Sequence, residues 1–445
     1  MLKAYFNKNI VNKLLKLAIP LFLEMLLGSL LMVVDTLMIT KYNEKFVASI
    51  GNAQVVLNFL VVLFNICSVG VGITVSQYIG GKKEDKAKNV LSHGILFNFC
   101  LSMIIFLVLF FFNMSLLKLV LTPDDIINES SNYIKIVSIG LPFMAMTSCI
   151  SADLKAHSKP YYVTIISFAT NILNVILNFI LIYGLFGLPS LGYIGAAIST
   201  TLCYIITFIA AVIVSRLSLK SRFLIRGFSK EIFSSIIKIG VPSAVENVCY
   251  NVSMFFVASQ VNILLSDMIT ARSYINVVLN FVLIFSSAFG SANAIIVGYN
   301  VGSHDYDGAK KATNITFLIC YPIILFAVTI LNLSAKLIFP LITSNTVILN
   351  AIYTVIPILF LLESGRCVNL IYINMLKSSG DTIYPVVCAI FSMFLIASFG
   401  SYLFVSVFQF GLIGIFLAQA LDEITRAILV LLRFKSNKWM NKSIV

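Results

Sequence analysis

Asp35 is the residue of this chain whose type and surroundings point most clearly to chemistry. It lies in the stretch Met32-Val-Val-Asp35-Thr-Leu-Met-Ile39, with no basic residue one helical turn away. If this stretch crosses a membrane, an ionised side chain there costs about 2.5–3.5 kcal/mol, and such residues usually mark an ion or proton pathway. Asp35 is therefore a candidate to exchange protons, or to bind Na⁺ if neighbouring oxygens complete the shell. The alternative is a structural acid that is hydrogen-bonded to a neighbouring helix.

Three amides further along the chain could supply those oxygens. Asn171, Asn174 and Asn178 lie in one apolar stretch, and the last two are four residues apart. On a helix that spacing places both side chains on one face. Their oxygens suit Na⁺ or a hydrogen-bond relay, whereas the alternative is polar packing between helices.

Two further acids each follow a proline by four residues. Glu24 follows Pro20, and Glu246 follows Pro242. Proline frees a backbone carbonyl and permits a helix to bend, so both acids lie beside a potential kink. For Glu24, a functional role and a solvated position near the membrane surface are both open. Glu246 is the stronger functional candidate of the two, because its apolar stretch contains no second acid.

The remaining charges in apolar stretches occur at helical spacing. Glu363 and Arg366 are three residues apart, and Arg426 follows Asp422 and Glu423 by one turn. Neighbours at this spacing neutralise each other on one helix face, so both sets are interpreted as structural ion pairs. A gating role for Arg366 is the alternative.

The elements that position these residues must be membrane helices. The chain has 445 residues, of which 59% are hydrophobic and 11% are charged. Soluble globular proteins carry about a quarter charged residues, so a soluble class is excluded. Apolar runs longer than the roughly 20 residues needed to cross a bilayer repeat along the whole chain. We therefore expect an all-α polytopic membrane protein.

Hydropathy and helix-breaking residues divide the chain into twelve expected transmembrane spans. They lie near 14–40, 47–79, 89–113, 131–154, 161–184, 191–216, 233–264, 272–302, 311–340, 348–376, 382–406 and 411–433. The first begins after a basic segment, but it is too long for a cleaved signal peptide. The expected domains are an N-terminal six-helix lobe at 1–216, a basic cytoplasmic linker at 217–232 and a C-terminal six-helix lobe at 233–445.

The two halves repeat each other at a constant difference in residue number. Pro20 is repeated as Pro242, and we call the difference between these two numbers the repeat offset. Lys16-Leu-Ala-Ile-Pro20 returns as Lys238-Ile-Gly-Val-Pro242, Gly80 returns as Gly302, and Leu154-Lys155 returns as Leu376-Lys377. Matches without slippage over a half-chain indicate two pseudo-symmetric bundles, an arrangement typical of transporters. Asp35 has no counterpart, because the position that matches it in the second half is Val257.

The basic residues that give the chain its net charge of +13 indicate how it is oriented in the membrane. Its basic residues cluster in alternate loops, as at Lys82, Lys83, Lys86 and Lys88. We therefore expect a multi-pass protein of the plasma (inner) membrane. The positive-inside rule predicts that both of its termini lie on the cytoplasmic side. Nucleic-acid binding is not expected, because these residues are dispersed over many short loops.

Metal and enzyme motifs are not expected. Eight cysteines fall in apolar spans at irregular spacing, three histidines are scattered, and no HExxH motif occurs. The cysteines are interpreted as small buried hydrophobes. We expect no catalytic residue and no cofactor other than a coupling ion.

Several motifs resemble the MATE (multidrug and toxic compound extrusion) transporters over essentially the whole chain. They are the repeated KxxxP opening, the VDTLMIT segment ending at Thr40, the GLPFM segment at Gly140, and the run from Asn174 to Thr200 that contains LGYIGAAIST. The partner of that last motif, Gly411-Leu-Ile-Gly414, follows at a distance slightly shorter than the repeat offset.

The resemblance implies two six-helix lobes around a cavity, and export of amphipathic, usually cationic compounds in exchange for Na⁺ or H⁺. It implies a cation site at Asp35 with Asn174 and Thr200. Many relatives carry an aspartate at the position of Asn178. Some also have an acid pair in spans 7 and 10, of which Glu246 matches the first, while Arg366 lies near the second.

The expected partners are small drug-like molecules and membrane lipids, with the protein acting as a monomer. One alternative is a flippase for lipid-linked saccharide precursors, which usually has additional spans and basic cavity residues. A remote alternative is an intramembrane enzyme.

Overall fold

The computed structural model describes residues 8–219 and 229–444, and every regular element in these ranges is helical. In the first half the long helices are α2 (Lys8–Tyr42), α5 (Glu84–Leu119), α6 (Ile127–Ala156), α7 (Pro160–Tyr183) and α8 (Tyr193–Leu219). Between α2 and α5, the helices α3 (Glu44–Val61) and α4 (Asn65–Gly80) are joined by the short 3₁₀ turn η1 (Val62–Phe64) and form one rod.

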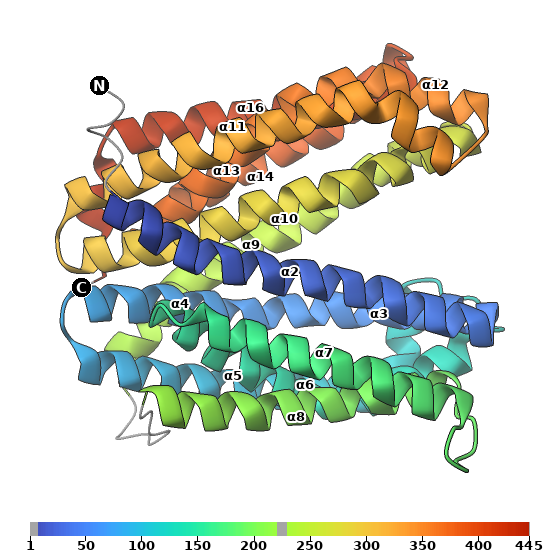
Figure 1. Ribbon diagram of the computed structural model, residues 1–445, viewed down its shortest axis with the longest axis horizontal. Coiled ribbons are helices and arrows are strands. Elements are labelled where there is room, and N and C mark those ends of the chain that lie inside the picture. The colour runs from blue at the N-terminus through green and yellow to red at the C-terminus, as the bar shows by residue number, and fades with distance from the viewer. Residues whose placement is uncertain (1–7, 220–228, 445) are drawn as a thin grey trace. The chain divides into compact units, whose positions relative to one another are not determined.

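The second half has the same order (Figure 1). Its continuous helices are α9 (Lys230–Asn262), α10 (Ser266–Gly302), α11 (Tyr306–Ile338), which continues into η2 (Phe339–Leu341), and α16 (Gly411–Lys435). The fourth rod consists of α12 (Thr346–Val355), η3 (Ile356–Ile358) and α13 (Leu359–Ser378). The fifth consists of α14 (Ile383–Ser392), η4 (Met393–Ser398), α15 (Phe399–Tyr402) and η5 (Leu403–Val407), with η4 and η5 in π-helical form. The short η6 (Lys438–Lys442) follows α16.

The twelve expected spans are all found as helical rods. Within the described residues, eleven helical segments are long and apolar enough to cross a membrane. The twelfth, α16, is 25 residues long and carries Asp422, Glu423 and Arg426 in its middle. These three buried charges lower its hydropathy.

The repeat offset is a property of the fold as well as of the sequence. Helices α4 and α10 end at Gly80 and Gly302. The turns that follow also repeat, with positive φ at Lys82 (57°) and at His304 (59°). In each turn the next amide donates back to a carbonyl five residues earlier, Lys83 to Tyr78 and Asp305 to Asn300. The same local hydrogen bonding ends both helices.

The chain packs into two units of contacting residues. One is Leu23–Ala244, and the other joins the residues up to Phe22 to those from Val245 onward. Both boundaries lie two residues after the helix-interior prolines, Pro20 and Pro242. The predicted linker falls mainly in residues 220–228, outside the described ranges, and the lobe limits predicted from the sequence remain a prediction.

Close backbone approaches hold the first of these units together. A Cβ on Gly240 of α9 would lie 1.8 Å from the carbonyl oxygen of Ile66 in α4, and one on Gly195 of α8 would lie 2.6 Å from that of Leu181 in α7. Small residues that let helix backbones approach are a common means of association inside membranes, where the hydrophobic effect drives helices together only weakly.

Gly240→Ala is therefore expected to destabilise the protein. Its new methyl group meets backbone, so the helices must separate, and overpacking of this kind costs about 1–3 kcal/mol. The thermal unfolding midpoint of purified protein in detergent should fall. Gly51→Ala is the control, since a Cβ there meets nothing within 4 Å. Equal midpoints for both variants would contradict the close contact.

Candidate functional site

Two helices of the first half place a carboxylate against two amides. Asp35 of α2 accepts a hydrogen bond from Asn178 Nδ2 of α7 through Oδ1, at 2.8 Å. The same amide nitrogen lies 3.1 Å from Asn174 Oδ1, one turn back on α7. The structure thus brings together Asp35, Asn174 and Asn178, the residues that the sequence singled out.

The chain of contacts continues to α8 through a residue that the sequence interpretation missed. Asn174 Nδ2 donates to Ser199 Oγ at 3.2 Å, and Ser199 Oγ donates to the Asn174 carbonyl oxygen. Thr200, the residue expected there, lines the same cavity as Asp35, but its hydroxyl donates to the Ala196 carbonyl of its own helix. The adjacent hydroxyl residues Ser199 and Thr200 indicate from sequence that this part of α8 could contact Asn174. Which of the two hydroxyls does so depends on the rotation of α8 about its axis.

The carboxylate faces a cavity of about 370 Å³ inside this unit. Its polar lining is rich in hydroxyl and amide groups, namely Thr36, Gln54, Asn58, Tyr133, Thr170, Asn171, Asn174, Asn178, Thr200, Tyr204 and Thr207. Asn178 Oδ1 is buried and has no hydrogen-bond partner among the described residues. Leaving a buried acceptor unpaired is costly, so this oxygen beside a carboxylate is set to receive a cation, a proton donor or water. The oxygen donors present fit Na⁺.

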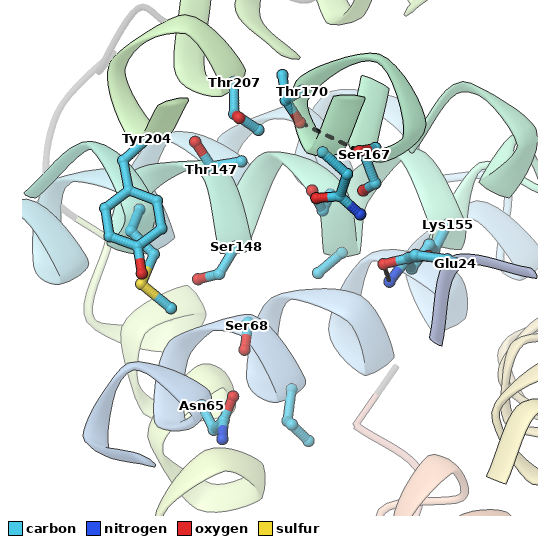
Figure 2. Close-up of a pocket in the computed structure, with 15 residues that line it drawn as sticks. Glu24, Asn65, Ser68, Thr147, Ser148, Lys155, Ser167, Thr170, Tyr204 and Thr207 are labelled. Carbon is cyan, nitrogen blue, oxygen red and sulfur yellow. Dashed lines mark hydrogen bonds and ion pairs between the residues drawn. The ribbon is translucent and has the colours of Figure 1, made fainter. Parts of the chain in front are cut away.

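A second cavity, of about 510 Å³, lies in the same unit and contains Glu24 (Figure 2). Glu24 Oε1 is 2.8 Å from Lys155 Nζ at the carboxyl end of α6. The negative end of the helix dipole favours a cation at this position. Glu24 is thus half of an ion pair that joins α2 to α6.

Glu246 forms the corresponding pair in the second half. Its Oε2 lies 2.7 Å from Nζ of Lys377 at the end of α13. Glu246 and Lys377 each follow their counterparts Glu24 and Lys155 by the repeat offset, so the ion pair is repeated with the fold. Neither partner could be chosen from sequence, because each pair joins segments that are far apart in the chain.

Arg366 lies in a buried charge network between α13 and α16. Its guanidinium hydrogen-bonds to Glu363 and lies 3.6 Å from Glu423. Arg426 in turn contacts Asp422 at 2.6 Å and Glu423 at 2.9 Å. The expected pairs along each helix are present, and Glu423 joins them into one cluster across two helices. Sequence spacing alone did not indicate that link.

The second-half counterpart of the Asp35 site is apolar. Val257, at the repeat offset from Asp35, is fully buried in a core cluster with Val261, Ala397, Val405 and Ile415. The counterparts of Asn174 and Asn178 are Ile396 in η4 and Gly400 in α15. The fold is repeated, but the polar site is not.

Within residues 8–219 and 229–444, no group of three or more His, Cys, Asp or Glu side chains could hold a metal ion. The eight cysteines are free in the structure, and five of them are buried. A cation at Asp35 would accordingly be held by one carboxylate together with amide and hydroxyl oxygens.

Comparison with known proteins places this architecture in a family. The MatE family model matches the chain twice, at residues 20–180 and 242–403. The uncharacterized transporter YisQ of Bacillus subtilis (strain 168) is 31% identical over 436 residues, covering 96% of this chain and 95% of that protein. The probable multidrug resistance protein NorM of Thermotoga maritima is 26% identical, covering 98% of this chain and 94% of that protein.

Among solved structures, one described as MATE in the bent conformation superposes with a TM-score of 0.88 at 18% identity, covering 96% of this chain and 95% of that chain. This likeness supports the fold. The two matched segments of the family model begin at the repeat prolines, Pro20 and Pro242, and together cover most of both halves. The chain belongs to the MATE family, whose members are multi-pass membrane transporters and not enzymes.

Proposed function

We propose that the protein is a secondary active multidrug exporter that moves amphipathic, cationic compounds outward in exchange for Na⁺ or H⁺. The observation that carries the proposal is the Asp35 site, where a carboxylate inside a membrane span accepts a hydrogen bond from the Asn178 amide, whose own buried oxygen has no partner among the described residues. A single anion surrounded by neutral oxygens can hold one Na⁺ or one proton. Similarity to a probable multidrug resistance protein supports the substrate class.

Helix α2 provides the means of coupling. Up to Phe22, the residues of α2 belong to the unit that contains most of the second half. In that unit the centroids of the Phe22 and Phe285 rings are 5.8 Å apart. Beyond Phe22 the helix packs in the other unit, through Glu24 and Asp35. A cation on Asp35 changes its hydrogen bond to Asn178, and the proline permits α2 to bend in response.

Exchange then follows from differential affinity. An ion shifts an equilibrium between two conformations only as far as it binds one of them more tightly. In the proposed cycle of alternating access, the cation and the drug favour opposite conformations, so movement of one drives the other. We further propose that the protein acts as a monomer in the plasma (inner) membrane, in contact with lipids and with both termini cytoplasmic, as its basic loops predict.

Export is favoured over the flippase alternative by the charge of the two cavities. Among the described residues that line them, Lys155 is the one basic residue, and it is already paired with Glu24. A site for pyrophosphate needs free cationic groups. The described residues that line these two cavities provide no such free cationic group.

The deciding experiment is transport in proteoliposomes with each ion gradient imposed separately. Purified protein is reconstituted, and uptake of a fluorescent amphipathic cation is followed under a Na⁺ gradient at equal pH, and then under a pH gradient at equal Na⁺. We expect one of the two gradients to drive uptake against the drug gradient. Failure of both, with transfer of a lipid-linked saccharide between leaflets in a parallel assay, would favour the flippase.

A further inference from the structure

The two cavities of the first half share one wall. Thr170 and Asn171 of α7 and Tyr204 and Thr207 of α8 line both the Asp35 cavity and the Glu24 cavity. All of these residues belong to the same contact unit. The Asp35 cavity therefore lies next to a second cavity lined by polar residues.

The two compartments lie at different heights along α7. Asn178, the partner of Asp35, is near the carboxyl end of this helix, and Thr170 of the shared wall is near its middle. Lys155 is in the last turn of α6, from which a short turn leads to Pro160 at the amino end of α7. In Figure 2, Tyr204 of the shared wall lies at one end of the second cavity, and Glu24 and Lys155 lie at the other. The order along α7 is thus the Asp35 site, the shared wall, and then the ion pair.

The lining of the second cavity suits a cation. The hydroxyls of Thr147, Thr170 and Thr207 each donate to a carbonyl oxygen four residues earlier in their own helix. A hydroxyl that has spent its proton in this way presents only acceptor lone pairs to other groups. Glu24 Oε2 is also buried and takes no hydrogen bond from any described residue. Acceptors are thus present both around the shared wall and at the ion pair.

We infer that the coupling ion leaves the Asp35 site through this second compartment, and that the Glu24–Lys155 ion pair is the gate at its end. A cation that arrives there replaces Lys155 as the partner of Glu24, and the lysine returns when the ion departs. The inference rests on the proposed function, since it requires Asp35 to bind the ion. It adds an exit route and two gating residues within the first half.

The repeat supplies a matched control. The second-half pair of Glu246 and Lys377 has the same chemistry and the same position in the fold, with a 2.7 Å contact. Neither residue lines either of the two adjacent cavities. The second-half counterpart of the Asp35 site is the apolar cluster around Val257, so a cation has no polar site there to leave. Breaking this pair should not open an ion path.

The test is passive ion flux in proteoliposomes without drug, measured with radioactive Na⁺ and with an internal pH dye. Lys155→Met is expected to raise the flux at least about fivefold, the lower end of ordinary coupling between sites. Lys377→Met should leave it at the wild-type level. The exchange variant Glu24→Lys/Lys155→Glu restores an ion pair and should return the flux toward wild type. Equal flux in Lys155→Met and Lys377→Met would overturn the gate.

Glu24→Gln covers the case in which Lys155→Met does not fold. It keeps the shape of the side chain and removes the charge that receives the ion, so gradient-driven export should slow while drug affinity is unchanged. A normal export rate in this variant would also overturn the inference.

The outcome separates the gate from the coupling site. In Lys155→Met/Asp35→Asn the added flux should disappear, because the ion can no longer enter the route. If Asp35→Asn abolishes coupled export but Lys155→Met does not leak, the gate fails and the proposed function stands. If Asp35→Asn exports normally, the coupling site itself is wrong, and the exit route that depends on it falls as well.

Discussion

Asp35→Asn is expected to reduce gradient-driven export to the level of empty liposomes while the protein remains folded in the membrane. The amide has nearly the same shape as the carboxylate and can still contact Asn178, so packing of α2 against α7 is retained. It cannot carry a negative charge or take up a proton, and the site loses its carboxylate. Export measured under each ion gradient, alongside the thermal unfolding midpoint, checks both halves of this expectation.

Asp35→Glu is the companion variant. It preserves the charge and lengthens the side chain by one methylene, so it should retain part of the coupling. Drug binding to Asp35→Asn should persist in the absence of a gradient, because the cation and the drug act on the conformational equilibrium from different groups. Asp35→Asn vesicles that export at the normal rate under either gradient would remove Asp35 from the mechanism.

Arg426→Leu is expected to be among the most destabilising single substitutions in the chain. Arg426 contacts Asp422 and Glu423, and all three residues are buried. Without it, three carboxylates of the network face the single guanidinium of Arg366. Removing one partner of a buried ion pair costs about 3–5 kcal/mol, because the remaining charge is left without compensation. The yield of folded protein and its thermal midpoint in detergent should both fall sharply.

Lys86→Gln provides the comparison for an exposed pair. Lys86 contacts Glu231 at 2.9 Å, but the two side chains are 44% and 66% exposed. Solvent screening limits such a pair to about 0–1 kcal/mol, so the midpoint should hardly move. Similar midpoints for Arg426→Leu and Lys86→Gln would show that the network around Glu423 contributes nothing specific to stability.

The helical rods were predictable because their signals are local. Membrane insertion depends on the hydropathy of about 20 consecutive residues, and all twelve rods except α16 satisfy it. Helix ends depend on turn chemistry within a few residues, which is why the turns at Lys82 and His304 repeat with the sequence. The absence of a second-half counterpart to Asp35 also followed from sequence, since the matching position is Val257.

Side-chain partners between helices were not predictable in the same way. The sequence indicated a hydroxyl near Asn174, yet Ser199 makes that contact and Thr200 turns to its own helix. Arg366 and Arg426 were expected in separate pairs, and Glu423 joins them. A rotation of one residue about a helix axis moves a side chain by about 100°, and hydropathy carries no information on that angle.

By itself, the sequence determined a twice-repeated helical membrane protein, and it showed that the intramembrane acid Asp35 is not copied by the repeat. The tertiary structure decided which group each charge meets: Asp35 meets Asn178, Glu24 meets Lys155, and Glu246 meets Lys377. It also decided that the Asp35 cavity and the Glu24 cavity are neighbours, with four lining residues in common. The physical reason is that spans and turns are fixed by neighbours along the chain. Polar partners are instead fixed by how closely and at what rotation whole helices pack, and small residues such as Gly240 set those distances.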